Sequence, residues 1–219
     1  VQRMTAQKWI AVADERIETL DRNGRRIRFD YNELGRLTTE TWLNPDNNVA
    51  NEIHYNYDAR GNRVSVFDNF SSLTHTYDAR NRVTNVDNAG TPELPNVVLV
   101  YSYDLVGNVL SVAETIDGQA GATTAYTYDA LNRLVQETQS DGGTAEKRVD
   151  FTFNDLSQYI SVNRFADLAG TRPVVQSEYI YDGMNRLVKL SHKSSTKTLA
   201  SFVQEFNAAS EITKAVNND

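Results

Sequence analysis

The first recurring residues that could take part in chemistry are five aspartates, each directly after a tyrosine: Asp58, Asp78, Asp104, Asp129 and Asp182. Such carboxylates could form an acid ladder, a chain of metal ligands or general acid/base pairs. In weaker copies of the phrase, Asn stands in place of Asp, at 32, 154 and 207. An Asx turn tolerates this exchange, because the side-chain oxygen only has to accept a hydrogen bond from a backbone N–H two residues on.

The spacing therefore predicts structural turn residues, with a Gly or Asn three residues after the Asx residue taking the left-handed conformation. The predicted turn residues are Asn32, Gly35, Asp58, Gly61, Asp78, Asn81, Asp104, Gly107, Asp129, Asn132, Asn154, Asp182 and Asn185. A basic residue recurs one position after the left-handed residue, and we expect it to pair with turn carboxylates or neighbouring carbonyls. These basic residues are Arg36, Arg82, Arg133 and Arg186.

Paired tyrosines and three histidines offer a second kind of chemistry. Exposed rings could stack on sugars, and the candidate ligand-stacking residues are Tyr55, Tyr57, Tyr101, Tyr103, Tyr126, Tyr128, Tyr179 and Tyr181. A tyrosine and one of His54, His75 and His192 meeting in a groove could support β-elimination on an acidic polysaccharide. Cross-strand packing accounts for the same rings without a ligand, and we favour it. The sequence has no Cys and no calcium-loop pattern, so we expect no metal site, no cofactor and no catalytic residue.

The elements that position these residues form a repeat. The second aromatic residue of each phrase recurs after 20 to 28 residues, at 31, 57, 77, 103, 128, 153, 181 and 206. The aromatic-x-aromatic spacing has the period of a strand, and Gly and Pro mark the breaks. The predicted fold is all-β: tandem hairpins of two strands, each of about ten residues, in a curved antiparallel strip. Two turn lengths are expected, the longer one, at Gly107, with a bulge.

The phrase Tyr-Asp-x-x-Gly/Asn-Arg-Leu/Val resembles the Rhs repeat, also called the YD repeat, over roughly residues 20 to 212. This repeat occurs in bacterial polymorphic toxins, in the C component of toxin complexes and in animal teneurins. The resemblance implies stacked hairpins that spiral into part of a hollow shell, which in toxin members encloses a C-terminal effector. It also implies a secreted or cell-surface location, although the sequence shows no self-cleavage signature and no effector.

We expect three regions: a weak or degenerate repeat over 1–19, one continuous domain of about seven to eight YD repeats over 20–212, and the C-terminal end of a fragment over 213–219. The predicted function is a non-catalytic structural shell or scaffold segment of a secreted or cell-surface protein, enclosing or presenting a C-terminal effector in the parent. The alternative is a carbohydrate-binding or lyase-type polysaccharide-degrading module.

Composition narrows the partners. The net charge of −7 disfavours nucleic acid, and the sequence contains no apolar run long enough for a membrane span. The expected partners are other repeats or domains of the parent, an enclosed effector or a glycan. Unpaired strand edges are expected near Ile17–Leu20 and Phe202–Phe206, together with two semi-apolar sheet faces. We therefore expect the chain either to close strongly on itself or to self-associate through these edges or faces.

Overall fold

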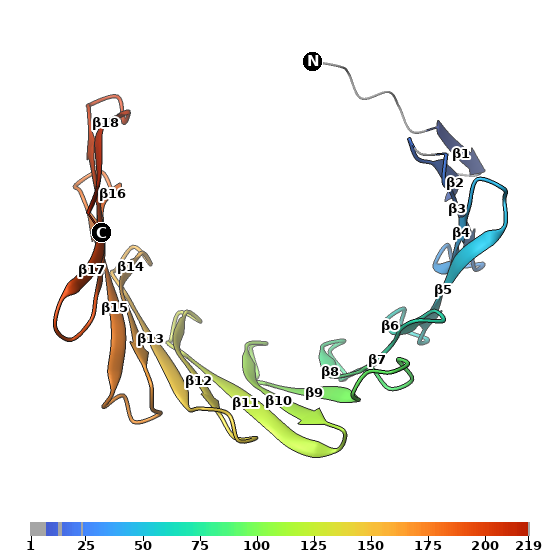
Figure 1. The fold of residues 1–219 in the computed structure, drawn as a ribbon, viewed down its shortest axis with the longest axis horizontal. Helices are drawn as coiled ribbons and strands as arrows, with labels where there is room; N and C mark the ends of the chain where they lie inside the picture. The colour runs from blue at the N-terminus through green and yellow to red at the C-terminus, as the bar shows by residue number, and fades with distance from the viewer. Residues whose placement is uncertain (1–7, 13–14, 23, 219) are drawn as a thin grey trace. The chain divides into compact units, whose positions relative to one another are not determined.

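The computed structural model describes residues 8–12, 15–22 and 24–218, and all regular structure among them is β-strand. The chain divides into two compact units, one of residues 1–100 and 116–118, the other of residues 101–115 and 119–219. In each unit, hairpins follow one another in chain order as a single layer (Figure 1). Among these residues there is no helix long and apolar enough to cross a membrane.

The strands of the first unit are β1 (Lys8–Val12), β2 (Glu15–Leu20), β3 (Arg26–Tyr31), β4 (Leu37–Leu43), β5 (Val49–Tyr57), β6 (Arg63–Phe67), β7 (Ser72–Tyr77) and β8 (Val83–Asp87). The boundary between the units falls within β9 (Val97–Tyr103) and β10 (Val109–Ile116). The strands of the second unit are β11 (Gln119–Tyr128), β12 (Leu134–Ser140), β13 (Lys147–Phe153), β14 (Tyr159–Phe165), β15 (Pro173–Tyr181), β16 (Leu187–Lys193), β17 (Thr198–Phe206) and β18 (Ile212–Asn218).

Consecutive strands pair antiparallel, from β1 to β9 and from β11 to β18. The all-β fold of tandem hairpins predicted from the sequence is confirmed. The strands are shorter than predicted, with five to ten residues each, because the turns and bulges use the residues between the ladders.

The prediction of two turn lengths is wrong. The Tyr77 hairpin, Tyr77↔Val83, and the Tyr128 hairpin, Tyr128↔Leu134, pair residues six apart across the turn, and so do the other hairpins of this kind with a described register. A register shift occurs at the second aromatic residue in all of them, for example between Thr76 and Tyr77. A single turn form with a bulge therefore serves all of these hairpins, because the bulge absorbs the odd residue that the turn adds.

The two faces of the sheet differ in polarity. On one face of the second unit, a row of paired residues runs Phe151↔Val162↔Ser177↔His192. The neighbouring row, whose side chains point to the opposite face, runs Thr152↔Ser161↔Glu178↔Ser191. We call the side of the tyrosine pairs the aromatic face and the other side the polar face. The apolar residues expected on the second face, Val98 and Val100 of β9, do lie on the polar face, where they pair with the polar residues Asp87 and Asn85.

The predicted strand edges are also wrong. Ile17–Leu20 lies in β2, which pairs with both β1 and β3, and Phe202–Phe206 lies in β17, which pairs with both β16 and β18.

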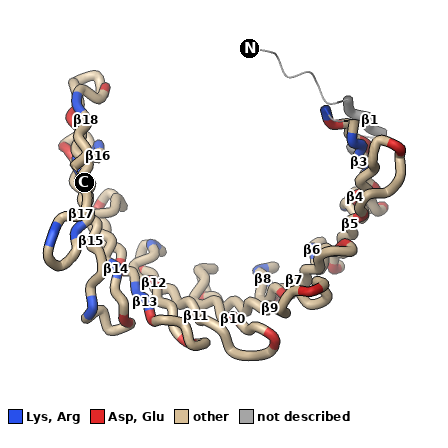
Figure 2. The backbone as a smooth tube through the Cα atoms, viewed as in Figure 1, with Lys and Arg blue, Asp and Glu red and all other residues tan. Residues whose placement is uncertain are grey.

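Few side chains are fully buried in such a layer: the buried hydrophobic residues among those described are Leu43, Ala122 and Val162. Charges of both signs are interspersed along each unit (Figure 2).

Candidate functional site

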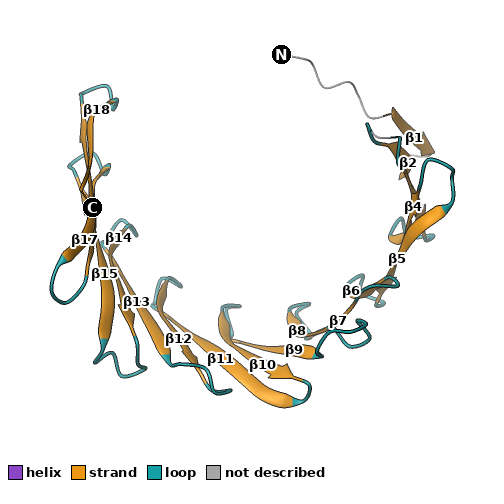
Figure 3. Cartoon of the chain, in the orientation of Figure 1, coloured by secondary structure: helices purple, strands orange, loops and turns teal. Residues whose placement is uncertain are grey.

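The hairpin turns hold the residues that recur in every repeat (Figure 3). At Asp58, Oδ1 accepts hydrogen bonds from the backbone N–H of Arg60 at 2.9 Å and of Asn62 at 2.8 Å. The backbone closes the loop, because Asp58 N donates to Asn62 O and Gly61 N donates to Asp58 O. The structure places all the predicted turn Asx residues in this arrangement, including the Asn copies: Asn32, Asp78, Asp104, Asp129, Asn154 and Asp182.

The residue three positions after the Asx residue has a positive φ throughout. Gly35, Gly61 and Gly107 have φ of 70°, 94° and 112°, and Asn81, Asn132 and Asn185 have φ of 60°, 60° and 63°. The sequence reasoning missed the serines that take this place in the worn copies, Ser157 and Ser210, at 62° and 63°. It also missed that Asn44 builds the same turn at the other end of a hairpin, although the Asn44-to-Asn47 spacing was a readable signal.

These hydrogen bonds lower the pKa of the turn carboxylates. The Asn62 side chain is the largest cause for Asp58, and partial burial opposes it. For Asp104, partial burial raises the pKa, but the bonds from Asn108 and from two backbone N–H groups outweigh it. At Asp78 and Asp129 the largest cause of the lowered pKa is the hydrogen bond from the backbone N–H of the Arg four residues on, and at Asp182 it is the hydrogen bond from the side chain of that Arg. Because their pKa values are lowered, all five are ionised at neutral pH, and hydrogen bonds to the ionised form are the cause.

At six of these turns, the residue four positions after the Asx residue donates to the next turn: those of Asn32, Asp58, Asp104, Asp129, Asn154 and Asp182. Arg133 donates from Nε to Asp129 Oδ2 at 2.7 Å, and from Nη1 to Asn154 O at 3.2 Å and Ser157 Oγ at 3.1 Å. Its guanidinium lies over the Phe153 ring, 4.7 Å from the centroid. We call this arrangement, in which one side chain bonds both its own turn and the following turn, the turn clasp.

The clasp recurs with different side chains. Arg186 repeats it on Asp182, Asn207 and Ser210, and lies 4.6 Å from the centroid of Phe206. Arg36 donates from Nη1 to Asp58 O of the following turn. Its guanidinium lies so close to that turn that a Cβ on Gly61 would be 3.2 Å from Arg36 Nη2. Amides do the same work at three positions that the sequence reasoning did not single out: Asn62, Asn108 and Gln158. The clasp therefore depends on a donor side chain rather than on positive charge.

The eight candidate ligand-stacking tyrosines are half-buried on the aromatic face: Tyr55, Tyr57, Tyr101, Tyr103, Tyr126, Tyr128, Tyr179 and Tyr181. Protein groups cover several of them. Arg36 lies over Tyr57, Tyr55 donates to Glu40 Oε2 at 3.2 Å, and Tyr179 contacts the Tyr159 ring. Sugar stacking by these rings stays a prediction, and nothing on the described residues favours it over packing.

The histidines do not come together. His75 stacks on Tyr77 in a shallow hollow, with ring centroids 6.5 Å apart, and burial lowers its pKa. The phenol of Tyr77 donates to Arg63 O at 2.8 Å, which engages the proton that an acid/base role would need. His192 lies 2.9 Å from Ser177 Oγ, on the aromatic face of the second unit. No group of three or more His, Cys, Asp or Glu suited to a metal ion occurs in the described part of the chain.

Phased hairpins joined turn to turn define a YD-repeat β-sheet protein. The chain matches the family model described as the teneurin YD-shell over residues 5–218. It therefore belongs to the teneurin YD-shell family, and the resemblance drawn from the tyrosine–aspartate phrase is confirmed. Its repeats are the structural repeats of such a shell.

Solved structures give similar folds at low identity. The Tc holotoxin pore of Photorhabdus luminescens with a mutated TccC3, and a TcdB2–TccC3–Cdc42 complex, each match 97% of this chain and 15% of the other chain, at 13% identity and a TM-score of 0.46. This chain thus spans 15% of the length of those chains. A porin-like protein from Bacteroides uniformis matches over 96% of this chain and 92% of its own, at 11% identity and a TM-score of 0.42. A search of curated proteins found no match.

Proposed function

We propose that this chain is a non-catalytic scaffold segment in the shell of a longer secreted or cell-surface protein, and that its aromatic face encloses or presents an effector domain of that parent. Membership of the YD-shell family supports the shell role. The turn clasps support it too, because each one fixes a hairpin to the next and uses its polar groups in doing so. Polar groups committed to the scaffold in this way are not free for catalysis.

The observation that carries the proposal is the uncovered aromatic face. Within each unit the described strands form one layer, and the tyrosines keep part of their surface exposed. A sheet normally buries its apolar face against a second layer, since leaving it in water forgoes about 25 cal/mol for each Å² of apolar surface. We infer that the second layer is supplied by other parts of the parent protein.

Hydroxyl-radical footprinting tests this arrangement. The 219-residue chain and its longer parent protein are oxidised side by side, and modification is read at Tyr126 and Tyr179 on the aromatic face. Phe67, which stacks on His54 on the polar face and is 38% exposed, is the internal control. We expect the tyrosines to be protected in the parent and the control to react equally in both proteins.

Equal oxidation of the tyrosines in both proteins would contradict the enclosing role. Protection confined to the polar face would contradict it as well, because it would place the partner on the wrong side of the sheet.

A further inference from the structure

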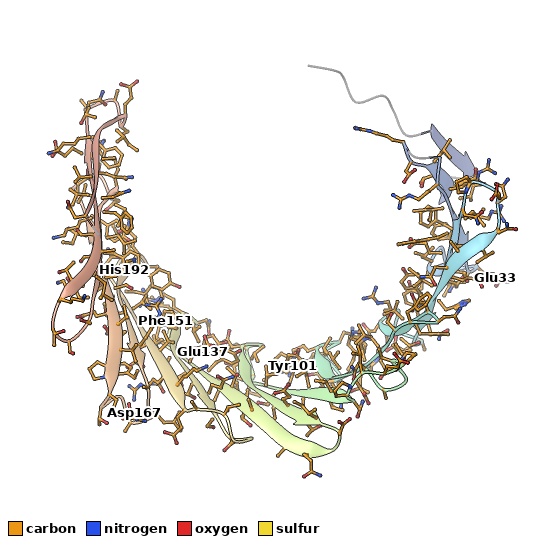
Figure 4. The ribbon with its side chains drawn as sticks, viewed as in Figure 1. Glu33, Tyr101, Glu137, Phe151, Asp167 and His192 are labelled. Carbon is orange, nitrogen blue, oxygen red and sulfur yellow. The ribbon has the colours of Figure 1, made fainter. Side chains whose placement is uncertain are left out.

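An open hollow of about 570 Å³ lies in the second unit, at the ends of β13, β14 and β15 away from the Asx turns. The apolar residues among its lining are Val149, Phe165 and Val174. Val149 pairs with Arg164 on the aromatic face, whereas Phe165 pairs with Arg148 on the polar face. The loop of residues 166–172 forms one side, and Asp167 holds that loop in shape by accepting hydrogen bonds from the backbone N–H groups of Thr171 and Arg172. Figure 4 labels Asp167 at this end of the strands.

The hollow is cationic, although the chain as a whole is acidic. Four cationic side chains line it, and the one carboxylate among the lining residues belongs to Glu146: the cations are Lys147, Arg148, Arg164 and Arg172. The Glu146 carboxylate accepts from Leu168 N, at 3.4 Å. The lining therefore carries an excess of positive charge in a protein of net charge −7.

Two of these cations are already neutralised. Arg148 donates to both carboxylate oxygens of Asp150 at 2.8 Å, and Arg172 lies 3.8 Å from the Asp167 carboxylate. Lys147 and Arg164 differ, because no carboxylate of the described residues lies within ion-pair distance of either. Arg164 is nonetheless held in place, since its Nη1 donates to Oγ of the fully buried Ser177 at 3.0 Å.

We propose that this hollow binds an organic anion, with a carboxylate between Arg164 and Lys147 and an apolar body against Val149, which pairs with Arg164 on the same face of the sheet. A guanidinium whose position is fixed by the protein loses little freedom on pairing, so it favours a carboxylate over a neutral group of the same shape. Such a carboxylate could come from a small organic acid or from an acidic side chain of a peptide segment flanked by apolar residues. This site does not depend on the shell role proposed above.

Titrations of the ¹⁵N-labelled full chain followed by NMR test the proposal. Phenylacetate and the isosteric phenylacetamide are the small probes, and blocked Leu-Asp-Leu and Leu-Asn-Leu are the peptide probes. We expect phenylacetate to shift the amides of Val149, Phe165 and Val174 with a dissociation constant in about the millimolar range. The amide probe should bind about tenfold more weakly, because it cannot form the charge-assisted bonds.

Two variants test which cationic side chains bind the carboxylate of the probe. Arg164→Gln should weaken phenylacetate binding about tenfold. Lys147→Gln, at an exposed position without a side-chain bond to the described residues, should weaken it without disturbing the fold. Lys197→Gln removes an exposed cation from the β16–β17 loop of the same unit and is the matched control, with no expected change. Melting temperatures of the three variants check that each is folded.

Tighter binding of Leu-Asp-Leu than of phenylacetate would identify a peptide as the natural source, and the reverse order would identify a small acid. The proposal is overturned if acid and amide probes bind equally. It is also overturned if the shifts lie outside the hollow, or if Lys147→Gln and Arg164→Gln, both folded, bind phenylacetate as the unmodified chain does.

Discussion

Replacing Arg133 by Ala tests whether the turn clasps hold the hairpins together. The substitution removes the bond to the Asp129 carboxylate, two bonds to the next turn at Asn154 and Ser157, and the contact with the Phe153 ring. Hydrogen bonds involving a charged group contribute about 1.5–3 kcal/mol, a partly exposed ion pair about 0.2–1 and a cation–π contact about 0.5–1. The Arg133 side chain is 23% exposed and these terms share one group, so they do not add fully. We expect a loss of about 2 kcal/mol in the free energy of unfolding.

The assay combines urea denaturation with native-state hydrogen exchange. Loss of the clasp should speed exchange first in the peptides around the turns at Asp129 and Asn154, since a repeat protein contacts mainly its neighbours. Arg60→Ala is the control: this exposed arginine makes only 3.4 Å bonds to carbonyls, and its loss should stay within about 0.5 kcal/mol.

A double-mutant cycle of Arg133→Ala with Ser157→Ala isolates the bond between the two turns, and we expect a coupling of about 0.5–1 kcal/mol. The reasoning is refuted if Arg133→Ala costs no more than Arg60→Ala, or if the cycle shows no coupling between Arg133 and Ser157.

Four further predictions concern the turns, the backbone and the aromatic face. Asp104→Asn should be mild in urea denaturation and Asp104→Ala should cost about 1 kcal/mol, because an amide oxygen still accepts the turn bonds; equal, large losses would show that the charge itself matters. Gly142→Ala should cost more than Gly143→Ala in the same assay: both have positive φ, but a Cβ on Gly142 would lie 2.3 Å from the Gly121 carbonyl carbon and one on Gly143 would meet nothing, so equal losses would refute the clash. Because the pKa of Asp58 and of Asp182 is lower in the folded chain than the ordinary 3.8, the stability that they contribute is complete above about pH 4 and is lost as the pH falls through the lowered values; a melting temperature that is flat from pH 4 to pH 2 would contradict this. If the aromatic face binds sugar, oligosaccharide titrations should shift the ring signals of Tyr101 and Tyr126, whereas a packing role predicts no shift.

The sequence by itself determined most of the features that are closed within about five residues, although the turn at Asn44 and the positive φ of Ser157 and Ser210 were missed. The turn at Asp129 needs only an acceptor side chain, a residue that tolerates positive φ at 132 and a backbone that reverses, so its Asx bonds could be read from spacing. The all-β class followed in the same way, because alternation within a strand is local. The replacement of Asp by Asn at 154 was enough to indicate that charge is dispensable at the turn.

Only the tertiary structure decided what links residues of different hairpins. Arg133 meets Asn154 and Ser157 across 21 and 24 residues, and the register between hairpins depends on bulges and loop lengths that no local pattern fixes. The same register buries Ser177 completely, holds Arg164 beside Lys147 at one hollow and pairs Ile17–Leu20 on both sides. Sequence periodicity gives the two faces of each strand. It does not give the side chain that bonds the turn of the next hairpin, because that depends on how neighbouring strands pair. The physical reason is that hydrogen bonds across a sheet join residues that are distant in the chain.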